Sequence, residues 1–292
     1  NNCICEKVDG GSFYPSGTNQ YIFDYLKEKI KKYKIKNPTD LPFIGGAMGY
    51  FSYDFGCRHK HITMPLEQVA TIPDAYFVFY DNAIIIDHVT DEVFITGLGI
   101  LQDAKKSVAA LIDQIESGEQ IEKEQIVKEQ EPLVHTPFFK SRFSEGVYKK
   151  AIKTMKNYIS KGDIYLANMT HTFSSPFQND PQNTYEKLRK VNPAPFSAYL
   201  PLEEFHVLCS SPERFLKVRN RNVETRPIKG TIPRGQTLKA DEVNRRTLEN
   251  SEKDKAELAM IVDLEQNNLK IICKPETVKV SELFKVEAFA TV

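Results

Sequence analysis

The sequence predicts an α+β protein with large antiparallel sheets, because helical and strand-like segments are interspersed without a fixed rhythm. Residues 20–37 and 144–160 have apolar side chains at helical spacing, and strand-rich stretches lie between such segments. A doubly wound parallel sheet would require strands and helices in regular alternation. The order observed therefore favours α+β over a Rossmann-type fold, and the sequence shows no internal repeat.

Length and composition limit the class of protein. The chain has 292 residues, of which 41% are hydrophobic, enough for one large domain or two ordinary ones. Lys plus Arg and Asp plus Glu both number 39, so no charge excess favours nucleic acid, and we expect a protein that acts on small molecules. No apolar run reaches the roughly 18 residues of a membrane helix, so we expect no membrane partner.

Cysteine usage and the N-terminal sequence bear on location. Five cysteines without a CxxC pair indicate reduced thiols and hence a cytoplasmic protein. The six histidines lack the spacing of zinc ligands. The opening "NNCICEKVDG" has neither a starting Met nor a signal-peptide pattern, so we expect the chain to begin inside a longer polypeptide.

The first part of the chain predicts two helices and several strands. A helix is expected over 20–37, followed by strands in close backbone contact within the glycine-rich "PFIGGAMGYFSYDFG". The stretch "AYFVFYDNAIIIDHVTDEVFITGL" predicts three strands, joined by turns at Asp81-Asn82 and Thr90-Asp91. A second helix is expected over 102–117.

A polar stretch then divides the chain. Residues 117–134, "SGEQIEKEQIVKEQEPLV", are poor in aromatic side chains and predict a linker or exposed excursion. We therefore expect an N-terminal region over 1–116, a linker or exposed excursion over 117–140 and a further region over 141–292.

Capping residues mark the later helices. Ser144 is expected to cap a helix that ends near Ser160, with Gly162 as its stop. "DIYLANMTHTFSSPF" predicts strand, 183–191 a helix, and 196–228 several strands with a turn near Asn220. Ser251 with Asp254 has the form of a capping box, which opens a helix toward residue 267.

Lys229 is the first candidate for chemistry. It lies in "TRPIKGTIPRG", where prolines stiffen the backbone and glycines allow close approach to a ligand. Burial or the neighbouring charges of Arg226 and Arg234 would favour the neutral, nucleophilic amine. The segment equally suits an exposed loop lysine, or an anion site formed by backbone N–H groups and two cations.

Three carboxylates are further candidates. Glu213, in "SSPERF", is either a general acid or base or the ion-pair partner of Arg214. Asp254 and Glu257 are three residues apart and share a helix face, where two oxygen ligands would suit Mg²⁺. Alternatively, Asp254 only completes the capping box and Glu257 is solvated.

Several motifs together resemble one family. "SSPERFL", "ETRPIKGTIPRG" and "SEKDKAELAMIVDL" occur in this order and closely resemble the chorismate-utilising enzymes, as do "PFIGGAMGYFSYDFG" and "KGDIYLANMTHTF". The resemblance covers nearly the whole chain. It implies a large two-layer antiparallel β-sandwich with helices outside, as in anthranilate synthase. It also implies that residues 141–292 are the first part of a chorismate-binding catalytic domain, whose C-terminal remainder lies beyond Val292 and completes the site.

Within the family, the sequence is most similar to the aminodeoxychorismate synthases. Anthranilate synthases carry alanine where Lys229 stands, and "NPAPFSAYL" resembles the aminodeoxychorismate form of a segment that binds tryptophan in anthranilate synthases. The implied reaction is amination of chorismate at C4, which belongs to the biosynthesis of 4-aminobenzoate and folate. The implied partner is a glutamine amidotransferase subunit that supplies ammonia.

The resemblance also implies a role for each site residue. Lys229 attacks C2 of chorismate and Glu213 acts as acid and base. Gly230 and Thr231 bind the substrate carboxylate through backbone N–H groups. Glu257, with Asp254 through water, holds Mg²⁺.

Two alternatives stay open. One is an anthranilate synthase component I. The other is a non-catalytic module of the same fold that binds tryptophan or another small molecule, with Pro195, Phe196 and Ser197 in its pocket.

Three positions depart from the family pattern. Leu166 stands where glutamine is usual, and Gln266 and Asn268 replace an arginine and an aspartate. The departures leave Lys229 and the carboxylates in place.

Overall fold

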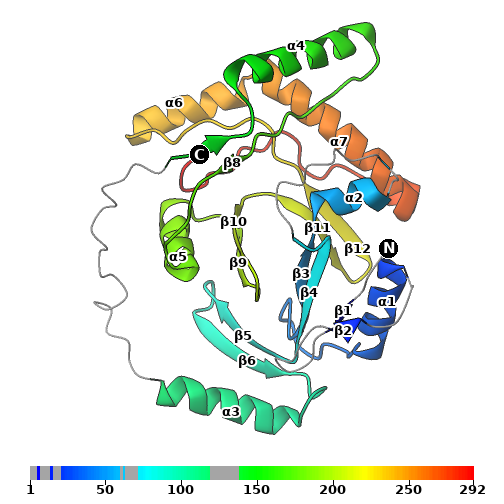
Figure 1. The fold of residues 1–292 in the computed structure, drawn as a ribbon, viewed down its shortest axis with the longest axis vertical. Helices are drawn as coiled ribbons and strands as arrows, with labels where there is room; N and C mark the ends of the chain where they lie inside the picture. Colours follow the sequence, from blue (N-terminus) through cyan, green and yellow to red (C-terminus); the bar gives the residue numbers. More distant parts are fainter. Residues whose placement is uncertain (1–4, 7–13, 16–20, 60–61, 63–71, 119–137) are drawn as a thin grey trace. The chain divides into compact units, whose positions relative to one another are not determined.

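The computed structural model describes residues 5–6, 14–15, 21–59, 62, 72–118 and 138–292. The chain divides into two compact units, Asn1–Thr136 and Pro137–Val292 (Figure 1). The predicted linker lies mostly outside the described residues. No helix in the described ranges is long and apolar enough to cross a bilayer.

In its described residues, the first unit contains antiparallel strand pairs and three helices. Strand β1 pairs with β2, β3 with β4, and β5 with β6. The bounds are β1 Cys5–Glu6, β2 Tyr14–Pro15, α1 Ile22–Lys32, β3 Gly46–Phe51, α2 Tyr53–His59, β4 Ala75–Tyr80, β5 Asn82–Asp87, β6 Glu92–Gly97 and α3 Ala104–Ser117.

The three strands predicted over 75–98 are confirmed, but one of the two turns is wrong. Asp91 has a left-handed φ of 57° in the turn between β5 and β6, as expected. Asp81 makes no hairpin, because β4 pairs with β3 and β5 pairs with β6. Its buried carboxylate instead accepts hydrogen bonds from the backbone N–H groups of Ile100 and Leu101, at 3.0 and 3.2 Å. These bonds join the residue after β4 to the segment that follows β6.

Close packing in this unit explains why two positions, Gly49 and Ser107, carry small residues. A Cβ atom on Gly49 of β3 would clash with the Tyr76 carbonyl of β4, which confirms the predicted close backbone contact. Ser107 of α3 is buried, and its Oγ donates to Asn82 Oδ1 at 2.6 Å. Helix α2 was not predicted, although Ser52 Oγ accepts from the Phe55 N–H and so caps its first turn.

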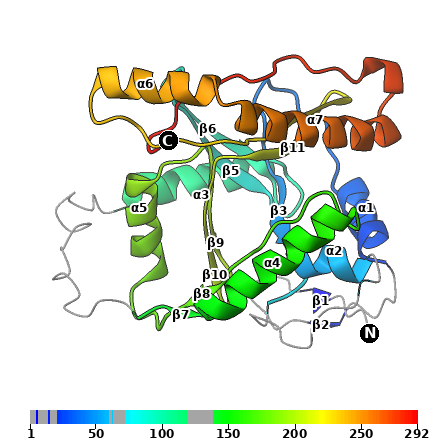
Figure 2. The same cartoon turned by 90° about the horizontal axis from the view of Figure 1, so that it is seen from above.

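The second unit has three further strand pairs and four α-helices in its described residues. Strand β7 pairs with β8, β9 with β10 and β11 with β12, all antiparallel. The bounds are β7 Lys140–Ser141, α4 Glu145–Lys161, β8 Phe173–Ser174, α5 Pro181–Val191, β9 Phe196–Pro201, β10 His206–Ser211, β11 Arg214–Arg219, β12 Asn222–Arg226, α6 Leu238–Glu249, α7 Glu252–Ile272 and a 3₁₀ turn η1 Pro275–Thr277. Figure 2 shows α6 and α7 following one another along one edge of this unit.

Local sequence signals account for most of these boundaries. Ser144 Oγ accepts from the Val147 N–H at the start of α4, and Gly162 ends that helix with a φ of 79°. The predicted turn near Asn220 is confirmed, since Asn220 and Arg221 both have positive φ between β11 and β12.

Three features of this unit differ from the sequence-based expectation. Only Phe173–Ser174 of "DIYLANMTHTFSSPF" is strand, because among the described residues the rest of that stretch has no strand to pair with. Helix α6 was not predicted, although Thr237 caps it by accepting from the Ala240 N–H. Helix α7 continues five residues beyond the expected end.

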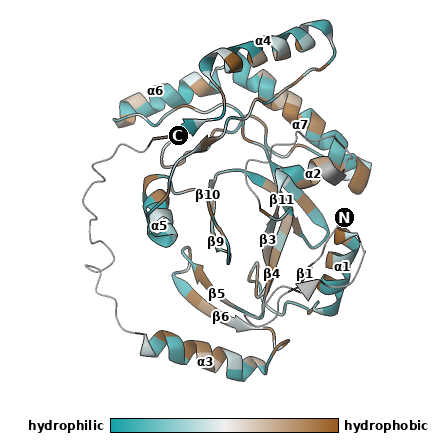
Figure 3. Cartoon of the chain, in the orientation of Figure 1, coloured by the Kyte–Doolittle hydropathy of each residue, from teal (hydrophilic) through white to brown (hydrophobic). Residues whose placement is uncertain are grey.

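The α+β class and the antiparallel pairing are confirmed. Each sheet has two strands within the described residues, so the large two-layer sandwich stays a prediction. Apolar and polar residues lie along the same helices, as α3 and α7 show in Figure 3. In the β11–β12 hairpin, Phe215 is 84% exposed and Val218 is 67% exposed, so this hairpin contributes little to a core.

Candidate active site

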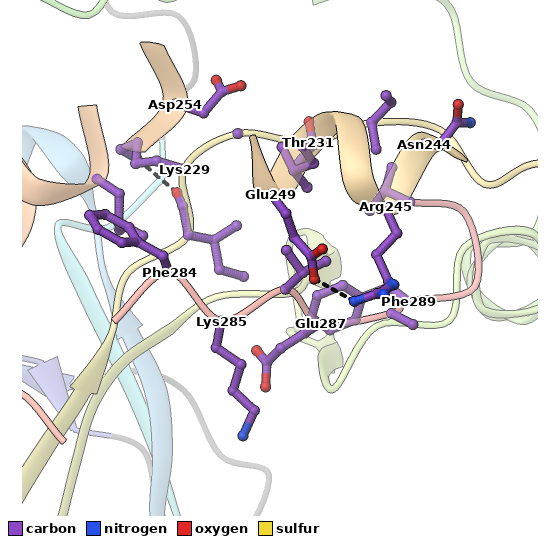
Figure 4. Close-up of a pocket in the computed structure, with 18 of the residues that line it drawn as sticks. Lys229, Thr231, Asn244, Arg245, Glu249, Asp254, Phe284, Lys285, Glu287 and Phe289 are labelled. Carbon is purple, nitrogen blue, oxygen red and sulfur yellow. Dashed lines mark hydrogen bonds and ion pairs between the residues drawn. The ribbon is translucent and has the colours of Figure 1, made fainter. Parts of the chain in front are cut away.

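The segment after β12 forms one wall of a cleft in the second unit. The cleft has a volume of about 200 Å³ and its walls are residues 227–234, helix α6, the first turns of α7 and residues 284–292 (Figure 4). Lys229, Gly230, Thr231 and Asp254 all line it. The structure therefore brings four of the predicted site residues to one cavity.

Gly230 allows the segment to lie against two helices. Its φ is 75°, a backbone angle that residues other than glycine rarely adopt. A Cβ atom here would lie 2.8 Å from Asp254 Cβ and 3.1 Å from Leu248 Cδ1. The position therefore requires glycine both for its backbone angle and for its packing.

Lys229 is half-buried, unlike an ordinary exposed loop lysine. Its Nζ donates to the Ile228 carbonyl at 3.1 Å, so the side chain turns back toward its own backbone (Figure 4). An ammonium group has three N–H donors, and this bond uses one of them.

Glu213 meets the same segment from the loop between β10 and β11. Its Oε1 accepts a hydrogen bond from the Ile228 N–H at 3.3 Å, so Glu213 contacts the residue that precedes Lys229. The alternative in which Glu213 pairs with Arg214 is wrong, because the Arg214 guanidinium bonds to Glu224 on the paired strand. Glu213 is thus available to a ligand near Lys229.

The two arginines that flank Lys229 in sequence are both neutralised. Arg226 pairs with Glu287. Arg234 makes a two-point contact with Asp241, with Nε–Oδ1 at 2.8 Å and Nη2–Oδ2 at 2.6 Å. The expectation that both arginines act as bare positive charges on Lys229 is therefore wrong.

Asp241 is held as a carboxylate by its surroundings. The hydrogen bond from Arg234, followed by the one from the Gly235 N–H, lowers the pKa of Asp241 to about 2. Arg234 Nη1 also donates to the Phe289 carbonyl at 2.8 Å. This cluster fastens the segment after Lys229 to α6 and to the C-terminal residues.

Asp254 lies in the first turn of α7, and its side chain also lines the cleft. Ser251 Oγ accepts from the Asp254 N–H at 3.3 Å, as predicted. The Ser251 N–H donates to the Leu248 carbonyl, so the reciprocal bond of a capping box is not made. The Asp254 side chain packs on Gly230 and lines the cleft, whereas Glu257 is half-buried outside the lining.

Asp254 and Glu257 would supply only part of a metal coordination shell. Within the described ranges, no three His, Cys, Asp or Glu side chains are grouped so as to hold a metal ion. Mg²⁺ commonly takes one or two carboxylates and fills its other positions with water and substrate oxygens. The donor chemistry of Asp254 and Glu257 fits such a partial set.

The sequence analysis missed Glu265 of α7. It is half-buried, and burial raises the pKa of Glu265 against the lowering effect of a hydrogen bond with the Thr225 side chain. The charge of Glu213 also raises this pKa and that of Lys229 lowers it, so both groups are near. The signal in the sequence is spacing: Glu265 follows Asp254 by eleven residues, about three full helical turns.

Pro195, Phe196 and Ser197 lie at the start of β9, where the hydroxyl of Ser197 has a local role. Ser197 Oγ donates to the Ala194 carbonyl at 2.9 Å, within a tight turn. The Arg214 guanidinium lies over the Phe196 ring, and its Cζ is 5.4 Å from the centre of that ring. A tryptophan-like pocket at these residues stays a prediction.

The three departures lie apart from the cleft lining. Leu166 is 42% exposed in the stretch without strand pairing. Gln266 is half-buried and Asn268 is exposed, both on α7.

Residues 9–292 match the family described as chorismate binding enzyme, and the chain belongs to that family. It is 36% identical over 253 residues to aminodeoxychorismate synthase component 1 of Escherichia coli, covering 87% of this chain and 53% of that protein. It is 33% identical over 279 residues to anthranilate synthase component 1 of Saccharomyces cerevisiae, covering 92% of this chain and 55% of the relative.

A solved structure agrees with this membership. The crystal structure of anthranilate synthase component I from Streptococcus pneumoniae superimposes with a TM-score of 0.80 at 25% identity, covering 100% of this chain and 65% of that one. The chain spans about half the length of the curated relatives it matches. Relatives named aminodeoxychorismate synthase and relatives named anthranilate synthase have similar identity to this chain. The choice between the two reactions therefore depends on the site residues.

Proposed function

We propose that the protein containing this chain is the synthase component of an aminodeoxychorismate synthase, which replaces the 4-hydroxyl of chorismate with an amino group. The observation that carries the proposal is the position of Lys229. Its amine is half-buried and lines the cleft, and Glu213 accepts a hydrogen bond from the backbone of the preceding residue, Ile228. Anthranilate synthases resemble this chain but have alanine at that position. The product would serve 4-aminobenzoate and folate biosynthesis.

The chemistry divides one difficult substitution into two easier ones. The neutral amine of Lys229 forms a bond to C2 while the C4–O bond breaks, and Glu213 donates a proton to the departing hydroxyl. Ammonia then adds at C4 while the C2–N bond to Lys229 breaks. Because the lysine occupies C2, ammonia is directed to C4.

The remaining groups bind and orient the substrate. The backbone N–H groups of Gly230 and Thr231 would approach a chorismate carboxylate, since no Cβ at Gly230 obstructs that approach. Glu257 and Asp254 would hold Mg²⁺, which supplies positive charge to offset the carboxylate on the ring. A glutamine amidotransferase partner would supply the ammonia.

The product made from chorismate tests the proposal. Full-length protein is incubated with chorismate, an ammonium salt and Mg²⁺, and the products are separated by chromatography. We expect 4-amino-4-deoxychorismate from the wild type and its loss in Lys229→Ala, with any residual amination moving toward C2. Lys239→Ala, an exposed lysine of α6, is the matched control and should behave as wild type. Anthranilate as the main wild-type product would refute the proposal and favour the second family reaction.

A further inference from the structure

Chorismate carries two carboxylates, and the proposed function supplies a cation for only one of them. Mg²⁺ would offset the carboxylate on the ring, whereas the carboxylate of the enolpyruvyl side chain has no positive partner. A carboxylate that leaves water is stabilised by a charge-assisted hydrogen bond from a cationic side chain. Among the described residues, the basic side chains that line the cleft are Lys229, Arg234, Arg245, Lys255 and Lys285.

Both arginines of the cleft already face carboxylates. Arg234 makes its two-point contact with Asp241. Arg245 donates to Glu242 through Nε at 2.8 Å and through Nη2 at 3.0 Å, and its Nη1 bonds to Glu249 (Figure 4). These carboxylates offset both guanidinium charges, which leaves the three lysines as candidates.

Two of the three lysines are less suited to a second substrate carboxylate. The proposed reaction requires the amine of Lys229 to be neutral when it attacks C2, so it cannot hold a carboxylate by charge at that moment. Lys285 is exposed and donates to Glu282 at 2.8 Å, so water and a well-placed carboxylate both compete with a ligand there. Lys255 is the candidate that remains.

Lys255 is a half-buried cation whose ion pair is weak. It follows Asp254 in the first turn of α7, and the Asp254 side chain packs on Gly230. In the described part of the chain it forms one ion pair, at 3.4 Å, with Glu252, whose side chain is 89% exposed. A pair of that length on a solvated carboxylate contributes little. Because an ammonium has three donors, Lys255 can bind a ligand in the cleft.

We propose that Lys255 binds the enolpyruvyl carboxylate of chorismate, and so favours ring acids that carry this side chain. This inference rests on the proposed function. The enolpyruvyl group keeps its bonds while the substituent at C4 is exchanged, so its carboxylate has the same charge in the substrate and in the transition state. The contact therefore stabilises both equally, and Lys255 sets the affinity for chorismate rather than the rate of the chemical step.

The test removes the charge of Lys255 in the full-length protein and measures binding and turnover separately. Calorimetry gives the Kd of chorismate with Mg²⁺ in a Lys229→Ala background, where no adduct can form. Steady-state kinetics with saturating ammonia give KM and kcat with Lys229 intact. For Lys255→Gln we expect Kd and KM to rise by about tenfold to 100-fold, through loss of one hydrogen bond between charged groups. We expect kcat to change by less than about twofold.

Two further variants separate a charge contact from a structural role. Lys255→Arg keeps the positive charge and should recover most of the affinity. Lys253→Gln removes an exposed charge from the same helical turn and should change none of the three quantities. An unchanged Kd in Lys255→Gln would overturn the proposal, as would a fall in kcat alone or an equal loss of affinity in Lys255→Arg. The identity of the wild-type product tests the proposed function separately, because Kd is measured without turnover.

Discussion

Two charged clusters of the second unit, only a few residues apart in the chain, are built in opposite ways. In the first, Arg234 and Asp241 match two nitrogens to two oxygens, and Gly235 and Phe289 supply further backbone bonds. In the second, Lys229 lies near Glu213 and Glu265, and in the described part of the chain no close ion pair joins it to either carboxylate.

The difference indicates which charges fix the fold and which are open to chemistry. The facing nitrogens and oxygens of the matched pair bond to one another, and the pKa shifts of the pair keep both partners ionised. Lys229 donates one N–H to a carbonyl, which leaves N–H donors of its amine for a ligand in the cleft. We therefore assign structure to the first cluster and chemistry to the second.

The largest effect is expected from Lys229→Arg. A guanidinium keeps the positive charge but stays protonated throughout the usable pH range and cannot attack. Formation of aminodeoxychorismate should fall by about 10³-fold or more, which steady-state kinetics would measure. A rate near that of the wild type would reduce Lys229 to a contact for a substrate carboxylate.

A smaller loss is expected from Glu257→Ala. Removing one oxygen ligand should weaken Mg²⁺ binding without touching Lys229, so the Mg²⁺ concentration for half-maximal activity should rise by about tenfold to 100-fold. Titration of activity with Mg²⁺ measures this shift. An unchanged titration curve would mean that Glu257 is not a ligand.

Gly230→Ala tests how closely the segment packs on α7. The added methyl group meets Asp254 and Leu248 while the backbone keeps a left-handed φ, which together should cost about 1–3 kcal/mol of stability. Chemical denaturation of the variant against wild type gives the difference. Gly146→Ala, in α4 with open space around its Cβ, is the control that should not destabilise.

The smallest effect, on stability alone, is expected from Asp241→Asn. The pKa of Asp241 is lowered in the folded state to about 2, so its contribution is present above the unfolded value of about 3.9. It is lost as pH falls from about 4 to about 2. Thermal melts should therefore show a lower Tm for the variant, by a constant amount above pH 5 and by a vanishing amount near pH 2. A difference that persists at pH 2 would contradict the assignment.

Local signals predicted much of the fold and tertiary contacts account for what was missed. Ser144 and Gly162 mark α4 because capping depends on neighbouring residues. Helix α6 escaped notice because "LKADEVNRRTLE" has few apolar residues from which to read a period. The stretch after Gly162 has strand-like composition, but a strand also needs a partner, which composition does not reveal.

The site was predictable in its motifs but not in its assembly. Lys229, Glu213, Asp254 and Glu257 lie in motifs that a single sequence displays. The effects of Glu213 and Lys229 on the pKa of Glu265 come from separate parts of the chain, which sequence order does not bring together. The neutralisation of Arg234 by Asp241 likewise depends on a contact that sequence order does not specify.

The most direct test of the central claim, that Lys229 is a nucleophile, is to look for its bond to the substrate. Full-length protein is incubated with chorismate and Mg²⁺ but without ammonia or an amidotransferase, and its peptides are analysed by mass spectrometry. We predict an adduct on Lys229 with the mass of chorismate less water, absent from Lys229→Ala, because nothing is present to expel the lysine. Normal aminodeoxychorismate formation when ammonia is added, from protein that shows no such adduct beforehand, would contradict the account.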